Sequence, residues 1–244
     1  MDIIRRNFFR LLRAGVMDEA NGIEPMSSYK WQRLAELLRQ QNVVALAVRG
    51  LQSCHDDKRM NMPEALREEL FKEAESQQCE IFDTEARLSN PLLNSRLKHI
   101  REAEPHVIDT NMETVRLLDL IVANINHIMN KGLSLQGILQ IGLYLRTQGQ
   151  HVDFVKLDKW LSRLHITRMA SLLGNLLVEV FEFETEEVPF IRKADTKASK
   201  QLLRTLQGDN SSPSTSGQLF LFQPLESSTR LVKKIKQQLE EIEE

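Results

Sequence analysis

Residues 110–131 contain the pattern that constrains the fold most, a complete helix with its own start and stop signals. Thr110-Asn111-Met112-Glu113 forms a capping box, in which polar side chains satisfy the first free N–H groups of a helix. Gly132 then supplies a stop signal. Between them, apolar residues recur every three or four positions: Val115, Leu118, Val122, Ile125 and Met129. This spacing predicts an amphipathic helix that buries one face against other helices.

Helical spacing continues through most of the chain, and turns are sparse. Only 10 Gly and 7 Pro occur in 244 residues, fewer than the roughly 7% and 5% of average proteins. The strand candidates Cys79–Phe82 and Leu219–Phe222 are too short to found a sheet. The sequence therefore predicts a mainly α fold, a multi-helix bundle-like array with little or no sheet. Further helices are expected near 4–12, from Ser27 or Ser28, over Val43–Leu51, from Pro63, over Ser134–Leu145, over Asp153–Leu164, over 167–181 and from Asp195 to near Gly208.

Composition divides the chain into four parts. Residues 1–82 form an N-terminal helical region, and residues 83–207 form a C-terminal helical region packed with it. Residues 208–217 are rich in Ser and Gly and read as a flexible linker. Residues 218–244 form a tail with a short apolar motif and a charged helix. In the helices with the best periodicity, we expect seven residues to be buried together: Leu118, Val122, Ile125, Leu139, Leu143, Leu161 and Leu172.

Charge and apolar content exclude several classes of protein. The formal net charge of -2 gives no electrostatic reason to expect direct nucleic-acid binding. No apolar run approaches the roughly 18 residues that a membrane span requires, so no membrane partner is expected. Four arginines near the start would also suit a membrane-surface helix, but the apolar spacing favours docking on the core. The two cysteines suit neither a disulfide framework nor a zinc site, and we expect a cytoplasmic location.

Three blocks of the sequence are residues 8–52, the segment Ser89-Asn90-Pro91-Leu92-Leu93-Asn94 and residues 111–190. In this order they resemble parts of a family of uncharacterised bacterial nucleotidyltransferases of the polymerase-β-like superfamily. The central block, Ser89-Asn90-Pro91-Leu92-Leu93-Asn94, resembles the segment that follows the catalytic sheet in that family. Residues 8–52 resemble its N-terminal helical region, and residues 111–190 resemble its C-terminal helical region. The resemblance singles out six family-motif positions: Ser89, Asn90, Pro91, Asn94, His127 and Gly132.

The catalytic core of that family has no counterpart in this sequence. The resemblance implies a Gly-rich turn and two acidic residues, because nucleotide transfer needs carboxylates that hold Mg²⁺ against a triphosphate. Asp56-Asp57 lies in a polar loop with adjacent side chains that project in different directions, and Gly208-Asp209 lies in the linker. Where the family carries Arg, Gln and Asp, this chain has Gln136, Gly137 and Gln140. We therefore predict no catalytic residue, no metal site and no cofactor.

The tail contains a second resemblance. Gln218-Leu219-Phe220-Leu221-Phe222 resembles the Gln-Leu-x-Leu-Phe peptide by which bacterial polymerases and mismatch-repair ATPases bind the replication sliding clamp. In such a peptide the Gln bonds a pocket rim while Leu and Phe fill an apolar groove. The alternative is that Phe220 and Phe222 pack on the helices of residues 111–181. Under the clamp hypothesis the partner-binding residues are Gln218, Leu219, Leu221 and Phe222.

Three functional hypotheses follow from these patterns. The first is a non-catalytic, degenerate nucleotidyltransferase-family helical protein that serves as a scaffold or binds an unknown protein partner. The second is a family enzyme that transfers a nucleotide to an unknown acceptor, with Mg²⁺ and a nucleoside triphosphate, through a centre not visible in this sequence or supplied by a partner. The third is a replication or repair accessory protein that binds the sliding clamp through its tail.

Overall fold

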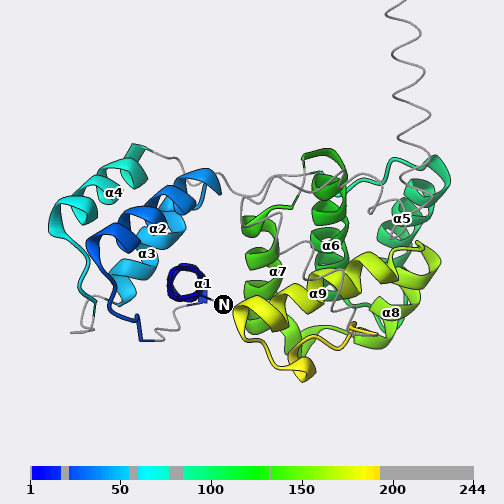
Figure 1. Ribbon diagram of the computed structural model, residues 1–244. Helices are drawn as coiled ribbons and strands as arrows, with labels where there is room; N and C mark the ends of the chain where they lie inside the picture. Colours follow the sequence, from blue (N-terminus) through cyan, green and yellow to red (C-terminus); the bar gives the residue numbers. More distant parts are fainter. Residues whose placement is uncertain (1, 18–21, 55–59, 77–84, 132, 193–244) are drawn as a thin grey trace, which may run out of the picture. The chain divides into compact units, whose positions relative to one another are not determined.

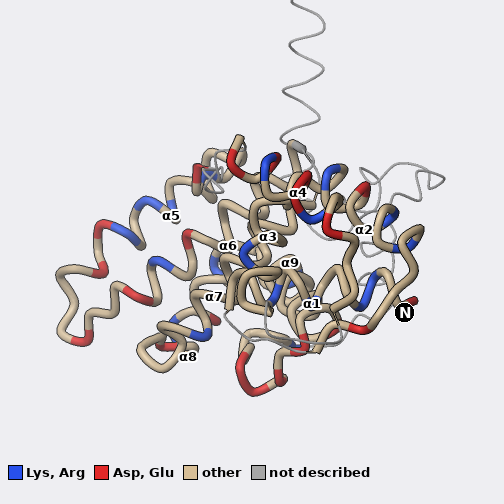
Figure 2. Tube along the Cα trace, turned by 90° about the vertical axis from the view of Figure 1, so that its left-hand side faces the viewer, with Lys and Arg blue, Asp and Glu red and all other residues tan. Residues whose placement is uncertain are grey.

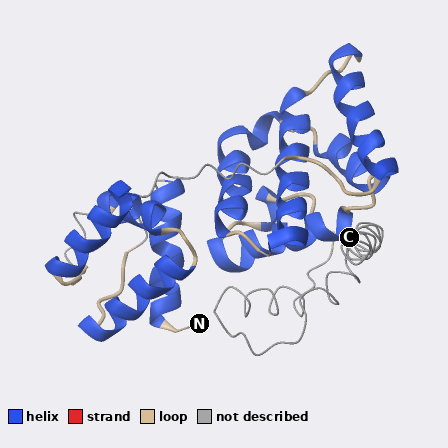
Figure 3. Cartoon of the chain, turned by 90° about the horizontal axis from the view of Figure 1, so that it is seen from above, coloured by secondary structure: helices blue, strands red, loops and turns tan. Residues whose placement is uncertain are grey.

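The structure is a computed structural model that describes residues 2–17, 22–54, 60–76, 85–131 and 133–192. Within these ranges it contains nine α-helices, three short 3-10 helices and no strand (Figures 1 and 3). The mainly α-helical prediction is confirmed. The α-helices are α1 (Ile3–Met17), α2 (Ser28–Gln40), α3 (Val44–Ser53), α4 (Glu64–Ser76), α5 (Pro91–Ala103), α6 (Met112–Lys131), α7 (Leu135–Gln148), α8 (Phe154–Arg163) and α9 (Thr167–Phe181). The 3-10 helices are η1 (Glu104–His106), η2 (Gly149–His151) and η3 (Thr185–Glu187).

The chain forms two compact units. Unit 1 contains α1 to α4, most of α7 and the end of α9, and unit 2 contains α5, α6, α8 and the start of α9. The division into an N-terminal helical region, 1–82, and a C-terminal helical region packed with it, 83–207, stays a prediction. The boundaries of unit 1 are Met1–Asp83, Leu135–Arg146 and Leu177–Phe183, and those of unit 2 are Thr84–Ser134, Thr147–Leu176 and Glu184–Glu244.

In unit 1, α1 and α3 pack backbone against backbone. A Cβ atom added to Gly15 on α1 would lie 1.9 Å from the carbonyl oxygen of Leu46. One added to Gly50 on α3 would lie 2.0 Å from the carbonyl oxygen of Leu11. Because no side chain fits at either position, the two glycines allow a close crossing that surrounding apolar side chains then seal. The first helix docks on the core as predicted, with Phe8, Leu11 and Leu12 buried.

The side chain of Asn61 in unit 1 bonds to Met26 and Trp31, which lie 35 and 30 residues away in the sequence. Trp31 of α2 is fully buried, and its Nε1 donates to Oδ1 of Asn61 over 3.1 Å. The same Oδ1 accepts from the backbone N of Met26 at 2.9 Å, and Asn61 Nδ2 donates back to the Met26 carbonyl at 2.9 Å. Asn61 therefore supplies the partner that the buried indole N–H needs.

In unit 2, α5 and α8 run in opposite directions beside one another. Arg96, near the start of α5, donates to the carbonyl of Arg163 at the end of α8. Glu104, directly after α5, pairs with Lys156 near the start of α8. Helix α6 packs against α8 and η1. These contacts place the segment after α5 next to the beginning of α8.

Most predicted helices agree with the structure to within one or two residues at their ends, but α1 and α7 extend beyond the predicted 4–12 and Ser134–Leu145. Ser27 precedes α2 as predicted but makes no side-chain capping bond. Asp153 caps α8 as predicted, and α9 spans the predicted residues 167–181. The capping residue of α6 is Asn111 rather than Thr110, because its Oδ1 accepts from the backbone N of Thr114 at 2.9 Å. Helix α6 ends at Lys131, before Gly132. Several predicted features lie outside the described residues: Gly132, the strand candidates Cys79–Phe82 and Leu219–Phe222, the helix from Asp195, the linker 208–217 and the tail 218–244.

Six of the seven predicted core residues are buried, and Leu143 is not. Helix α7 buries a stripe centred on Ile138, Gly142 and Leu145. Leu143 follows Gly142 by one residue, about 100° around the helix, which carries it off that stripe, and 37% of it is exposed. Leu139 and Leu143 belong to unit 1, and the other five residues belong to unit 2. No helix among the described residues has the length and apolar content needed to cross a membrane.

Three helices end on residues with left-handed backbone that are not glycine. Asn42, His165 and Glu182 have φ values of 52°, 56° and 55°. Asn42 and His165 lie two residues after the last residues of α2 and α8, and Glu182 directly follows α9. The residue after each returns a hydrogen bond to the helix, as Ile166 does to the Leu161 carbonyl at 3.0 Å. This is the usual geometry of a glycine helix end. At these three positions a residue with a side chain therefore adopts the strained left-handed backbone that glycine usually supplies.

Candidate functional site

The central family-motif segment forms the start of α5. Asn90 precedes the helix, and its Oδ1 accepts from the backbone N of Leu92 at 3.1 Å and of Leu93 at 3.3 Å. Pro91 occupies the first helical position, where its missing N–H costs nothing. Asn94 Oδ1 accepts from the backbone N of Leu88 at 3.2 Å. These side chains bond to backbone groups at the helix start, and Ser89 beside them is half-buried.

Two helices fasten the segment that leads into this motif. Asn126 of α6 donates to the carbonyl of Glu85 at 3.0 Å, and Arg101 of α5 donates to the carbonyl of Ala86 at 2.7 Å. Arg101 also pairs with Asp119 of α6 at 2.7 Å. Burial raises the pKa of Asp119, and the bonds from Arg101 act in the opposite direction. The neighbouring family-motif residue, His127, is half-buried on α6.

The stretch that replaces the family's charged residues lies on α7. Gln136 Nε2 donates to the carbonyl of Asn42 at 3.3 Å, so it contacts the turn after α2 within unit 1. Gly137 is buried and Gln140 is half-buried. At Gln136, a neutral amide therefore contacts backbone where the resemblance implies a charged side chain.

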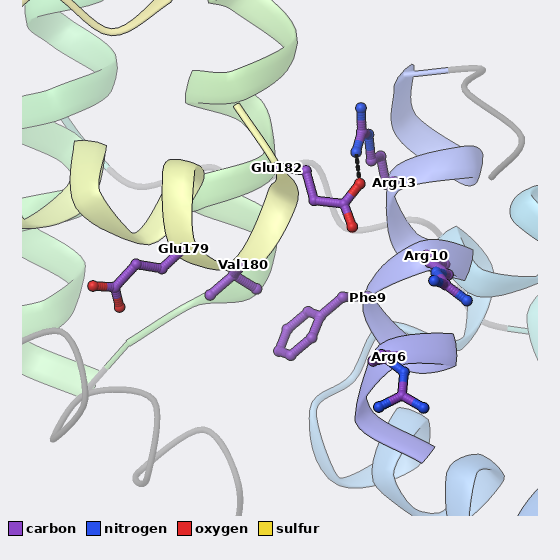
Figure 4. A pocket seen from close by; sticks show the side chains of 7 residues that line it. All are labelled: Arg6, Phe9, Arg10, Arg13, Glu179, Val180 and Glu182. Carbon is purple, nitrogen blue, oxygen red and sulfur yellow. Dashed lines mark hydrogen bonds and ion pairs between the residues drawn. The ribbon is translucent and has the colours of Figure 1, made fainter. Parts of the chain in front are cut away.

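A pocket of about 230 Å³ lies within unit 1 (Figure 4). One wall comes from α1, and the other comes from the last turn of α9 and the residue after it. Phe9 and Val180 supply its apolar surface. The remaining lining residues are charged: Arg6, Arg10, Arg13, Glu179 and Glu182. The lining therefore combines both signs of charge with an apolar floor.

The arginines of this pocket bond to carboxylates of the same unit. Arg6 bonds both carboxylate oxygens of Glu24, at 2.8 and 2.9 Å, and Arg10 bonds Glu24 Oε1 at 2.8 Å. Arg13 pairs with Glu182 at 2.5 Å. The Arg6 hydrogen bonds, with a further contribution from Arg10, lower the pKa of Glu24 to about 2. Because these guanidinium groups already hold carboxylates, the pocket is a poor candidate for binding a free anion.

In unit 2, a buried carboxylate holds the loop after α5. Glu104 is buried, and its Oε1 accepts from Lys156 Nζ at 2.8 Å and from the backbone N of Asn111 at 2.7 Å. Lys156 also donates to the carbonyl of Asp109 and pairs with its carboxylate at 3.2 Å. The hydrogen bond from Lys156 lowers the pKa of Asp109. Asn111 Nδ2 donates to the carbonyl of His151 at 2.9 Å.

Large apolar side chains are exposed around this cluster. Ile108 is fully exposed and Val155 is 67% exposed, while Val107 and Met112 are also exposed. Each lies within a few residues of Glu104, of Lys156 or of a residue to which one of these two bonds. We call these four residues, Val107, Ile108, Met112 and Val155, the apolar surface. Charged residues of both signs lie on helices of both units (Figure 2).

Sequence reasoning did not identify the apolar surface, although one signal was available. Val107 and Ile108 form an apolar pair between Pro105 and Asp109, where no helical period explains them. The exposure of Met112 and Val155 depends instead on which face each helix buries. That face is set by tertiary packing, which periodicity alone does not define at a helix end.

Several predicted site residues lie outside the described part of the chain. They are Gly132 and the clamp-motif residues Gln218, Leu219, Leu221 and Phe222. The acidic pairs rejected as metal sites, Asp56-Asp57 and Gly208-Asp209, lie outside it as well. Among the residues that the structure does describe, no group of three or more His, Cys, Asp or Glu is placed to hold a metal ion.

Comparison with known proteins leaves the resemblance unsupported by a match. No protein-family model, no curated protein and no solved structure matches the chain.

Proposed function

We propose that this chain is a helical protein-interaction module, a degenerate nucleotidyltransferase-family protein of the cytoplasm that has no catalytic centre of its own. Its binding site is the apolar surface of unit 2. The observation that carries this proposal is the exposure of Ile108 and Val155 on segments held by the buried Glu104–Lys156 pair. Large apolar side chains exposed on segments that hydrogen bonds hold together offer a surface that a protein partner can cover.

The energetics favour a partner that offers apolar side chains. Fully burying one large aliphatic side chain contributes about 1.5–3 kcal/mol. Two such anchors supply much of the energy that a transient interface needs. The hydrogen bonds of Glu104, Lys156 and Asn111 hold the loop in place, so that little ordering cost remains to be met on binding.

The family-motif residues support the non-catalytic part of the proposal. Asn90 and Asn94 bond to backbone groups at the start of α5, and Gln136 bonds to the turn after α2. Side chains with these structural roles are not needed to position a triphosphate. The resemblance at Asn90 and Asn94 then reflects folding rather than catalysis.

A matched pair of surface variants tests the interaction. The full-length protein, the variant Ile108→Ser/Val155→Ser and the control Leu92→Ser are each used to capture partners from cell extract, with quantitative mass spectrometry. Leu92 is 74% exposed on α5 but lies outside the apolar surface. We expect one or more proteins to be lost with the double variant and retained with the control. Equal capture by all three folded proteins would refute the proposal.

A second candidate function is binding to the replication sliding clamp, which the sequence Gln218–Phe222 favours. Here a peptide spanning Ser216–Leu225 should bind a bacterial clamp with micromolar affinity. Replacing Leu221 and Phe222 by Ala should abolish that binding, because these residues would fill the groove. A peptide that does not bind the clamp would remove this candidate.

A further inference from the structure

The last described residue, Arg192, bonds to α8. This helix also carries Val155 of the apolar surface. Arg192 donates to both carboxylate oxygens of Asp158 on α8, at 2.7 and 2.6 Å, and to Ser162 Oγ at 3.1 Å. Its backbone N donates to Ser171 Oγ at 2.9 Å. Side chain and backbone therefore both anchor Arg192 in unit 2.

This anchor lies close to the apolar surface. Asp158 follows Val155 by three residues on α8, a rise of about 4.5 Å along the helix axis. Residues 155, 158 and 162 fall on one side of a helix because they are spaced by three and four. The segment after Arg192 thus begins within about one helical turn of Val155.

The sequence beyond Arg192 contains an uncharged apolar segment of suitable chemistry. Leu219-Phe220-Leu221-Phe222 places four large apolar side chains in succession. About 25 residues separate it from Arg192, and at about 3.3 Å per extended residue they span about 80 Å. The intervening residues are therefore long enough for the segment 219–222 to contact the apolar surface, which begins near Arg192.

We propose that the segment Gln218–Phe222 occupies the apolar surface within the same chain and competes there with the partner protein. The inference rests on the proposed function, since it assigns an internal ligand to the same surface. In an extended segment alternate side chains share a face, so Phe220 and Phe222 point the same way. These two rings are the anchors, and they bury against Ile108 and Val155.

Photo-crosslinking of the full-length protein tests this contact. A benzoylphenylalanine replaces Ile108 in one sample and Leu92 in the control, and mass spectrometry identifies the linked peptides. We expect position 108 to link to residues 218–222 of the same chain. Phe220→Ala/Phe222→Ala should lower the yield about tenfold, as the loss of an interface anchor does. Leu219→Ala/Leu221→Ala should leave the yield nearly unchanged. Circular dichroism verifies that each variant folds.

Three results would overturn the inference: no product with residues 218–222, equal yields from positions 108 and 92, or products only between isotopically distinct copies. A second measurement separates this failure from failure of the proposed function. A labelled Ser216–Leu225 peptide is titrated into the Phe220→Ala/Phe222→Ala protein, with and without Ile108→Ser/Val155→Ser. Suppose that the peptide binds saturably, that the serine changes abolish this binding, and that no internal crosslink forms. The internal contact is then refuted, and the apolar surface remains a docking site.

Discussion

Replacing Gly15 by Ala should destabilise unit 1, because the α1–α3 crossing has no room for a methyl group. The added Cβ would lie 1.9 Å from the Leu46 carbonyl oxygen and 2.9 Å from the Gly50 backbone N. The shorter distance is about 1.5 Å below the 3.4 Å at which ordinary van der Waals contact begins. Both obstacles are backbone atoms, so no side-chain rotation can relieve the clash and the helices must separate.

The magnitude follows from two opposing effects. Overpacking a core costs about 1–3 kcal/mol, and a clash with backbone lies at the upper end of that range. Alanine returns about 1 kcal/mol because it favours a helix over glycine. The free energy of unfolding of unit 1 should therefore fall by about 2 kcal/mol.

Urea unfolding followed by Trp31 fluorescence measures this effect. The chain has two Trp residues, so Trp160→Phe as a background leaves buried Trp31 as the reporter of unit 1. With a slope of about 2 kcal/mol per molar urea, the midpoint should fall by about 1 M. Gly149→Ala is the control, since no atom lies within 4 Å of the added Cβ, and circular dichroism should show little change. A Gly15→Ala protein as stable as the parent would refute the close crossing.

Three further changes test other contacts. Asn61→Ala should lower the stability of unit 1 by about 1–3 kcal/mol and shift the Trp31 emission, because the buried indole N–H loses its acceptor; unchanged emission and midpoint would contradict this. The pKa of Glu24 is lowered from 4.5 to about 2, so its stabilising effect is complete above pH 4.5 and is lost as pH falls toward 2. The stability difference between the parent and Glu24→Gln should shrink across that window, and a pH-independent difference would exclude the assignment. His165→Gly should raise stability in thermal melts by up to about 1 kcal/mol, because glycine adopts positive φ without strain, whereas a lower melting temperature would argue against a strained helix end.

Most helices, and the Asp153 cap, could be predicted from the sequence because their causes are local. Asp153 reaches N–H groups two and three residues ahead, so its neighbours in sequence define the contact. Helix α9 matched its predicted residues because the apolar spacing continues to Phe181. The α6 cap was misassigned by one residue, since Thr110 and Asn111 are both good capping residues and only geometry decides between them.

The contacts that define the two units could not be predicted, because they join residues distant in sequence. Gly15 and Gly50 have ordinary helical neighbours, and neither reveals that the other lies against it. Asn61 lies 30 residues from Trp31, and no spacing rule relates them. The exposure of Leu143 likewise follows from which stripe of α7 is covered.

Less of the candidate site than of the fold could be predicted from the sequence. The family-motif residues Asn90 and Asn94 were singled out by resemblance, and the structure gives them contacts with the backbone at the start of α5. The apolar surface depends on the Glu104–Lys156 pair, which joins residues 52 positions apart. The pairing of Glu104 with Lys156 can be recognised only when the two segments that carry these residues are placed together in the structure.

Calorimetric titration of the full-length chain with Mg²⁺-ATP tests most directly the claim that it is a binding module and not an enzyme. Among the described residues no group of three or more His, Cys, Asp or Glu is placed to hold a metal ion, so Mg²⁺ would find no protein ligands there to help stabilise the triphosphate charge. We predict no saturable heat below about millimolar nucleotide, an affinity weaker than about -4 kcal/mol. Saturable binding at micromolar nucleotide that disappears when one or two acidic residues are replaced would contradict the account and favour the nucleotidyltransferase alternative.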